Sequence, residues 1–150
     1  MPRESGVRIF VNSASFTPDF SFALWVKFIY EDDPESVIFE ADPCSFLRTA
    51  NNNIKLIINY DNYSIEEEST SIVQFNTWIF FLMIHSFTDK TLILFQEYDT
   101  IIDKLIPDDT GGIIFPDYDI LLGKSTGYIR NFFLMNEHQK INTDYMDKYL

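Results

Sequence analysis

Few residues in this 150-residue chain belong to the types that perform nucleophilic or acid–base chemistry. The histidines are His85 and His138, and the single cysteine is Cys44. His85 shares one face of the run 78–87 with apolar side chains, which favours a hydrogen-bonded structural histidine over a catalytic base. His138 falls in a polar turn, and Cys44 has only Arg48 nearby in sequence as a cation that would activate its thiol. Nucleophilic catalysis is therefore not predicted.

Acidic loops are the second group of side chains with a definite chemistry, because Ca²⁺ takes about six to eight oxygen ligands. The candidate ligands are two adjacent pairs of carboxylates, Asp32 with Asp33 and Asp108 with Asp109. No spacing matches a defined calcium loop, so the contributing loops would have to converge in space. Two interpretations stay open, a calcium site and a solvated acidic surface, of which the second is favoured. Calcium is the one cofactor that the sequence suggests.

Sugar binding needs aromatic rings for stacking, with amide or carboxylate groups that orient hydroxyls on the same surface. Two stretches of the chain combine these residue types. The first is a predicted hairpin tip with Asn59, Tyr60, Asp61, Asn62 and Tyr63, and the second is the run Asp117, Tyr118 and Asp119. Each stretch also fits an ordinary turn whose tyrosine covers a sheet edge, so both are candidate ligand sites only.

The charge of the chain restricts its partners. Lys and Arg number 11 against 23 Asp and Glu, which gives a formal net charge of −12. Such a surface repels a phosphate backbone and an anionic lipid headgroup, which argues against nucleic acid and membrane docking. The longest apolar run, 78–84, is far shorter than the roughly 20 residues of a membrane-spanning helix. The expected partner is therefore a protein or a glycan.

Length and cysteine content bear on organisation and compartment. A chain of 150 residues that is 46% hydrophobic suits one domain, residues 1–150, with one core. A lone cysteine cannot form an internal disulfide, which fits a reducing compartment or a secreted domain that is stable without cross-links. The compartment stays open: cytoplasm or a large complex for a complete chain, and cell surface or secretion for an excised domain.

The elements that must position these residues are strands, because the dominant hydrophobic period is two. In the run 20–30, apolar side chains alternate with a second set that includes Trp25 and Lys27. About a dozen short strands are expected, with turn signals roughly every 8–12 residues, which is typical of an antiparallel sandwich. We expect 66–70 to be a polar connection, Pro43 and Cys44 to interrupt a strand, and only the tail, 142–150, to be helical.

Four runs in a fixed order resemble one family of folds. They are 20–27 (FSFALWVK), 78–81 (WIFF), 91–99 (TLILFQEYD) and 120–136, which ends in GYIRNFFLMN. These runs are similar to motifs of the concanavalin A-like lectin/glucanase superfamily, and within it to laminin G-like and pentraxin-like jelly rolls. The resemblance covers roughly residues 7–150. It implies an all-β, two-sheet antiparallel jelly-roll sandwich with a short C-terminal helix, in which Trp25 and Trp78 are packing residues.

The chain also departs from that family at places that bear on activity. The glycosidase branch carries a Glu-x-Asp-x-Glu run, whereas here Glu97 and Asp99 are followed by Ile101. The same segment lacks the family's usual Asn-Gly or Asp-Gly turn, so we expect a longer hairpin loop at Glu97-Tyr98-Asp99. An enzyme is therefore not predicted, and no catalytic residue is named.

The resemblance and the residues together predict a non-catalytic binding or interaction module. Its ligand is a protein or a carbohydrate, with protein contact favoured because no single site stands out. Two alternatives stay open. One is a structural subunit of a larger assembly with no small ligand, and the other is a divergent glycoside hydrolase.

Overall fold

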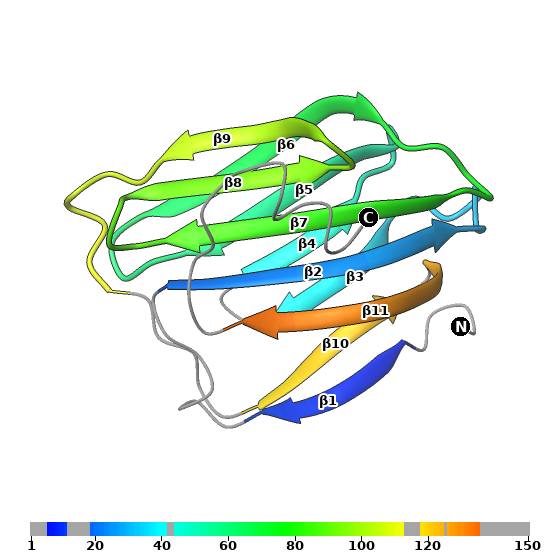
Figure 1. Cartoon of the computed structure of the whole chain (residues 1–150), viewed down its shortest axis with the longest axis horizontal. Coiled ribbons are helices and arrows are strands. Elements are labelled where there is room, and N and C mark those ends of the chain that lie inside the picture. Colours follow the sequence, from blue (N-terminus) through cyan, green and yellow to red (C-terminus); the bar gives the residue numbers. More distant parts are fainter. Residues whose placement is uncertain (1–5, 12–18, 42–43, 113–117, 125, 136–150) are drawn as a thin grey trace.

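The computed structural model describes residues 6–11, 19–41, 44–112, 118–124 and 126–135, and all of its regular elements are strands (Figure 1). The strands are β1 (Val7–Val11), β2 (Asp19–Phe28), β3 (Ser36–Ala41), β4 (Cys44–Arg48), β5 (Asn53–Asn59), β6 (Ser64–Ile72), β7 (Trp78–Ser86), β8 (Thr91–Gln96), β9 (Asp99–Leu105), β10 (Tyr118–Lys124) and β11 (Gly127–Met135). Within these ranges no helix has the length and apolarity needed to cross a membrane. The predicted C-terminal helix, 142–150, lies outside the described residues.

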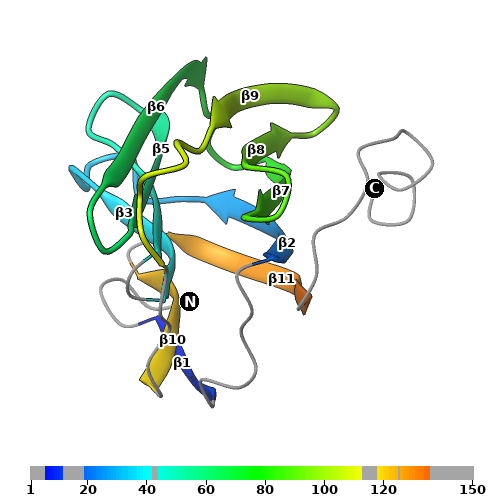
Figure 2. The same cartoon turned by 90° about the vertical axis from the view of Figure 1, so that its left-hand side faces the viewer.

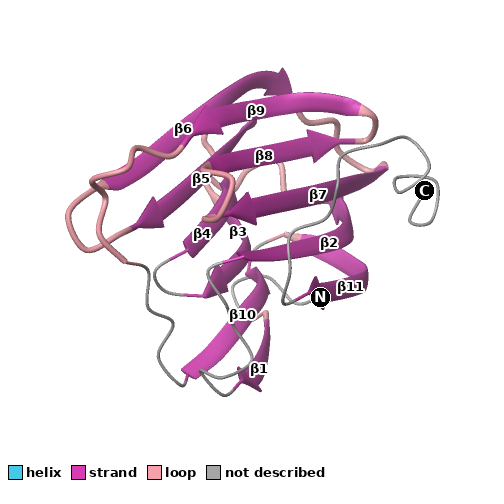
Figure 3. Ribbon diagram, turned by 60° about the vertical axis from the view of Figure 1, so that its left-hand side comes forward, coloured by secondary structure: helices cyan, strands magenta, loops and turns pink. Residues whose placement is uncertain are grey.

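The strands form two antiparallel sheets that face each other (Figures 2 and 3). Sheet I has six strands in the order β1-β10-β3-β4-β5-β6, and sheet II has five in the order β11-β2-β7-β8-β9. Neighbours far apart in the chain, such as β11 and β2, pair over most of their length. This arrangement confirms the predicted all-β, two-sheet antiparallel sandwich.

The core lies between the sheets and is built largely from alternate residues of each strand. On β2 every second side chain from Phe20 to Phe28 is fully buried. Aromatic rings join the layers: Phe22 of sheet II stacks on Phe39 of sheet I with ring centres 4.5 Å apart. Since sheets in a sandwich pack about 10 Å apart, side chains of this size fill the space from both faces. The period of two seen in the sequence therefore corresponds to burial.

Two strand predictions were wrong for the same physical reason. The acidic run 66–70 is not a connection but the middle of β6, a nine-residue strand at the edge of sheet I. Ile65 and Ser69 are buried, and Glu66 and Glu68 are exposed on the opposite face. Lys55 pairs with Glu66, and Lys104 of the other sheet pairs with Glu67. Likewise Cys44 does not interrupt a strand but begins β4. In both places an antiparallel partner determined the structure more than local polarity did.

The hairpin between β8 and β9 is tighter than predicted. Gln96 pairs directly with Asp99, which leaves a two-residue loop of Glu97 and Tyr98 rather than a longer one. The positive φ that such a loop requires falls on Glu97 (φ 56°) rather than on Tyr98. Two hydrogen bonds with Phe80 hold Glu97 there. The Phe80 amide donates to the Glu97 carboxylate (3.0 Å), and the Glu97 amide donates to the Phe80 carbonyl (2.8 Å). These bonds offset the strain of a non-glycine residue in that conformation.

Candidate functional site

The outer face of sheet II is apolar, although an antiparallel sheet normally turns polar side chains away from the core. Its central residues form a second hydrophobic cluster on β2, β7 and β8, separate from the core between the sheets. No member of this cluster is more than 8% exposed: Ala23, Phe80, Leu82, Ile84, Ile93 and Phe95. Because these central side chains are buried, a binding surface on this face has to be built from its exposed residues.

At one end of this face lies a group of side chains that we call the aromatic platform: Trp25, Lys27, Trp78, Tyr128 and Arg130. Strand register places them together, because Lys27 pairs with both Trp78 and Tyr128, and Trp25 pairs with Arg130. Directly opposite residues of antiparallel strands point to the same face. Both tryptophans are half-buried, whereas Tyr128 is 49% exposed.

Arg130 lies at the centre of the platform. Its guanidinium carbon is 4.2 Å from the ring centre of Trp78 and 5.1 Å from that of Trp25. Trp78 and Tyr128 are neighbours, with ring centres 6.5 Å apart. A guanidinium over an indole face is attracted by the negative potential of the ring, with a gain of about 0.5–2 kcal/mol according to exposure. The platform is thus a preorganised set of rings around one cation.

Two backbone features of β11 aim these side chains. Asn131 has a φ of 53° and sits in a β-bulge between Arg130 and Phe133. The extra residue allows Arg130 and Phe133 to pair with outward-facing partners on β2 while Phe132 packs against the core. At the start of the strand, Gly127 has a φ of 129°, and a Cβ there would lie 2.4 Å from the carbonyl oxygen of Lys27. Only glycine permits this approach of β11 to β2.

A polar pocket of about 240 Å³ adjoins the platform through Trp78, which it shares. Its lining residues come from β6, β7, β8 and the turns beside them: Ile72, Gln74, Thr77, Trp78, Ile79, Gln96 and Glu97. The side-chain oxygen of Gln96 is buried and accepts no hydrogen bond within the described part of the chain. A buried acceptor of this kind is costly until a donor reaches it. The pocket therefore offers amide, hydroxyl and carboxylate groups next to an aromatic ring.

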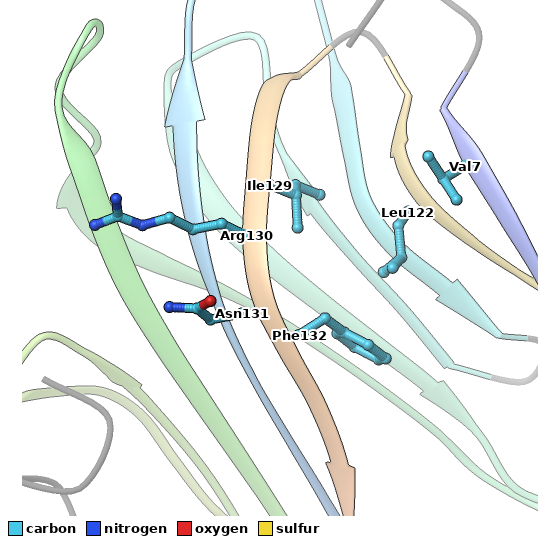
Figure 4. A pocket seen from close by; sticks show the side chains of 6 residues that line it. All are labelled: Val7, Leu122, Ile129, Arg130, Asn131 and Phe132. Atoms are coloured by element: carbon cyan, nitrogen blue, oxygen red, sulfur yellow. The ribbon is translucent and has the colours of Figure 1, made fainter.

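A second pocket, of about 310 Å³, opens between β11 and the pair β1 and β10 (Figure 4). In Figure 4 the side chains of Ile129 and Phe132 point towards Leu122 and Val7, whereas Arg130 points away, across β2 towards β7. The groups that face the opening are thus apolar. This pocket offers area for an apolar group but few polar atoms to orient one.

The predicted ligand cluster at 59–63 forms the turn between β5 and β6, and the structure divides it. Asn59, Asp61, Asn62 and Tyr63 are exposed, whereas Tyr60 is buried. The turn is fastened to the loop after β9, because the Asp61 carboxylate accepts from the amide of Gly112 (3.1 Å). Ligand binding by the four exposed residues stays a prediction.

The second predicted cluster is described only in part. Asp117 lies outside the described residues, and for Tyr118 and Asp119 the structure gives backbone pairing alone, with Val11 and Phe10 of β1. Their role as ligand-binding residues stays a prediction.

The two acidic pairs proposed as calcium ligands lie at opposite ends of the sandwich (Figure 1). The loop with Asp32 and Asp33 adjoins Arg48, which donates to the Asp33 carbonyl (3.0 Å) at one end of β4. Asp108 and Asp109 precede the segment that bonds to Asp61, beyond the other end of sheet I. Among the described residues, no three or more His, Cys, Asp or Glu side chains gather in a metal-binding group. The two pairs do not share one site, and calcium binding at either pair stays a prediction.

Two of the side chains considered for catalysis, His85 and Cys44, are structural, and His138 lies outside the described residues. His85 is buried and its Nε2 lies 2.7 Å from the hydroxyl of Tyr60, which confirms the predicted hydrogen-bonded histidine. Cys44 is fully buried, and burial raises the pKa of its thiol from 9.0 to about 12. Arg48 does not activate it, because the guanidinium lies among the Ser36 hydroxyl and backbone carbonyls at the opposite end of β4.

Sequence reasoning missed the aromatic platform even though a signal for it was present. Alternation along β2 already placed Trp25 and Lys27 on the face opposite to the core residues. The resemblance to the family assigned both tryptophans to packing, and this is confirmed for Trp25, which packs against the outer hydrophobic cluster with its ring centre 5.4 Å from that of Phe80. Arg130 could not be added from the sequence, because its position depends on the bulge at Asn131 and on the pairing of β11 with β2.

No family model and no curated protein matches the chain. Solved structures do match it. The chain resembles the receptor-binding domain of botulinum neurotoxin mosaic serotype C/D (TM-score 0.72, 16% identity), covering 98% of this chain and 40% of that one. It is also similar to the botulinum neurotoxin serotype D binding domain (TM-score 0.70, 15% identity), again covering 98% and 40%.

A further match is the botulinum neurotoxin DC binding domain in complex with SialylT (TM-score 0.66, 12% identity), which covers 88% of this chain and 34% of that one. The chain thus spans about 40% or less of the structures named here. At identities of 12–16% this likeness shows the fold alone. The comparisons therefore show that these solved structures share the β-sandwich fold of this chain.

Proposed function

We propose that this chain is a non-catalytic binding module, related to the concanavalin A-like lectins, that recognises a glycan at the aromatic platform. The observation that carries the proposal is the placement of Trp25, Trp78 and exposed Tyr128 around Arg130. A sugar ring presents an apolar face of C–H groups, and aromatic side chains supply a large, flat contact area for it. The rings already contact one another or Arg130 without a ligand, and such preorganisation lowers the entropic cost of binding.

The polar pocket beside Trp78 supplies the second requirement of sugar binding. Gln74, Thr77 and Glu97 line it together with the Gln96 side-chain oxygen, which accepts no hydrogen bond from the residues that the structure describes. A sugar stacked on Trp78 would direct hydroxyl groups towards these atoms. A hydroxyl that donates to Gln96 would satisfy a buried acceptor, so specificity would come from the pocket and contact area from the platform.

The structural neighbours agree with a binding role in general terms. Two of them are botulinum neurotoxin DC binding domains, one in complex with SialylT and one with rat synaptotagmin II. A third belongs to botulinum neurotoxin type C, whose cell entry depends on interaction with two ganglioside molecules. These statements apply to chains more than twice as long as this one. They support the class of function, while the site proposed here depends on this chain's own surface.

Protein contact is the second candidate, and it is favoured by a specific observation. The same outer face of sheet II carries two further exposed apolar side chains, Phe133 on β11 and Leu105 on β9, at its opposite edges. Tryptophan, tyrosine and arginine are also the residues most enriched at protein-binding hot spots. A protein partner would contact exposed residues at both edges of the face, whereas a glycan would need only the platform.

A glycan array followed by titration of the purified chain tests the proposal. We expect saturable binding that Trp78→Ala weakens by about five- to tenfold, because one stacking ring is worth roughly 1–1.5 kcal/mol. Tyr63→Ala is the matched control, since Tyr63 is an exposed aromatic at the turn between β5 and β6. Loss of binding in Tyr63→Ala but not in Trp78→Ala would move the site to that turn. Measurement with calcium and with a chelator tests the calcium prediction in the same series.

A further inference from the structure

The platform is cationic in a chain that is strongly acidic. Lys27 and Arg130 lie on it together, although the chain carries a net charge of −12. In the described part of the structure the ion pairs are made by other lysines, Lys55 with Glu66 and Lys104 with Glu67. Neither Lys27 nor Arg130 has a carboxylate partner among the described residues. Two uncompensated cations on one small surface are therefore a local exception to the charge of the molecule.

Arg130 is also held in a way that leaves its hydrogen-bond donors available. Its guanidinium packs over Trp78 and lies near Trp25, contacts that engage the flat faces of the group. It donates no hydrogen bond within the described residues, so its N–H groups are not engaged by that part of the chain. A planar guanidinium with free donors matches the two oxygens of a carboxylate, and stacking removes much of the freedom that pairing would otherwise cost.

We infer that the platform recognises an acidic glycan, in which a sugar carboxylate pairs with Arg130 while a neighbouring sugar ring stacks on Trp78 or Tyr128. Lys27, opposite Tyr128 in the register, adds a second positive charge on the same side. This inference rests on the proposed function and adds the chemical class of the ligand. Sugars with a carboxylate, such as sialic or uronic acids, combine both features that the platform offers.

The test compares three probes that share one disaccharide core: 3′-sialyllactose, lactose, and 3′-sulfated lactose. Isothermal titration or ligand-detected NMR on the purified chain gives the affinity for each. We expect 3′-sialyllactose to bind about tenfold more tightly than lactose, because a charged hydrogen-bonded pair outweighs a neutral one. The sulfated sugar carries charge without a carboxylate and is expected to bind less tightly than the sialylated one. Equal affinity for these two acidic probes would overturn the carboxylate assignment.

Variants separate the charge from the stacking. Arg130→Gln should abolish the preference for 3′-sialyllactose and leave lactose binding within about twofold, and Arg130→Lys should restore only part of the preference. Lys104→Gln removes the same charge at the opposite edge of sheet II and should change nothing. An unchanged preference in Arg130→Gln would overturn the inference. So would an equal loss of lactose and sialyllactose binding.

Failure of the inference and failure of the proposed function give different results. If wild-type chain binds lactose and 3′-sialyllactose equally and Trp78→Ala loses both, the platform is a glycan site without charge selectivity. If no glycan on the array binds saturably, both proposals fall. Binding of an acidic peptide that depends on Arg130, without binding of any glycan, would identify protein contact as the role of this face.

Discussion

The hydroxyl of Tyr60 lies 2.7 Å from Nε2 of His85, and this hydrogen bond joins the two sheets inside the core. Tyr60 follows β5 of sheet I, and His85 belongs to β7 of sheet II. The imidazole also stacks on Phe20, with ring centres 4.9 Å apart. A polar pair surrounded by aromatic rings is stable only while both partners are present, because a buried unpaired group loses its hydration without compensation.

Replacing Tyr60 with Phe is therefore expected to destabilise the fold. The ring remains while the hydroxyl is lost, so His85 keeps its packing but loses its hydrogen bond to Tyr60. We expect the free energy of unfolding to fall by about 1–3 kcal/mol, measured by urea denaturation. Tyr63→Phe is the matched control, since the Tyr63 side chain is exposed, and it should change stability by less than about 0.5 kcal/mol. Equal effects of the two variants would contradict the structural role of the pair.

Cys44 is expected to be chemically inert in the folded chain. Burial raises the pKa of its thiol from 9.0 to about 12, so the reactive thiolate is scarce at pH 8 and the sulfur is inaccessible. A thiol reagent such as iodoacetamide should label the native chain far more slowly than the chain unfolded in guanidinium. Rapid labelling of the native chain would show that β4 opens readily or that the thiol is exposed.

The same pKa shift predicts a loss of stability at alkaline pH. Above pH 9.0 the unfolded chain releases the Cys44 proton while the folded chain retains it up to about pH 12. The unfolded state then binds fewer protons, so the free energy of unfolding falls as pH rises, by up to about 1.4 kcal/mol per pH unit. Cys44→Ala removes this contribution, and its stability should decline less steeply between about pH 9.5 and 11. Parallel curves for the two proteins would disprove the linkage.

Arg48 is a buried hub, and its replacement is expected to be costly. Its guanidinium donates to the Ser36 hydroxyl (2.8 and 3.1 Å) and to the Asn52 side chain (2.9 Å), and it lies over Phe75. Burial lowers the pKa of the group, an effect that the nearby Asp33 and Glu35 charges oppose. Arg48→Met preserves most of the side-chain volume but removes every hydrogen-bond donor. We expect the free energy of unfolding, measured by thermal melts, to fall by about 3 kcal/mol. Arg8→Met, on exposed β1, should be nearly neutral in the same thermal melts.

Much of the fold was predictable because burial in a sandwich repeats every two residues. In β2 the period identifies both faces without any knowledge of the partner strands. The errors arose where local composition and tertiary pairing disagree. The glutamates of 66–70 resemble a loop, yet β5 supplies their hydrogen bonds and Lys55 supplies an opposite charge. Glu97 adopts a conformation suited to glycine because Phe80 satisfies both its amide and its carboxylate.

The candidate site was less predictable because it is assembled from strands distant in sequence. Trp25, Trp78 and Arg130 are each separated by more than fifty residues, and only the order of sheet II brings them together. The exposed turn near Tyr63 was easier to find, since its residues are contiguous. Sequence reasoning therefore favoured contiguous clusters and passed over the surface that strand pairing creates. Contiguity can also mislead: Tyr60 lies in a polar run, which predicts a surface position, yet the structure buries it.

Gly127 connects the stability of the fold to the geometry of the platform. It immediately precedes Tyr128, and a methyl group at its Cα would lie 2.4 Å from the Lys27 carbonyl oxygen and 2.9 Å from the Ile29 side chain. Because its φ of 129° is also unfavourable for other residues, Gly127→Ala must push β11 away from β2. We expect a loss of about 1–3 kcal/mol in the free energy of unfolding.

The matched control is Gly112→Ala, where an added Cβ would come no nearer than 3.4 Å to the Asp61 carboxylate. This variant should be close to neutral in the same denaturation series. A displaced β11 also moves Tyr128 and Arg130 relative to the tryptophans on β2 and β7, so tryptophan fluorescence of the folded Gly127→Ala chain should change while that of Gly112→Ala should not. Equal stability and a wild-type emission spectrum in both glycine variants would contradict the close approach of β11 to β2. The position of Arg130 on the platform would then lack its structural basis.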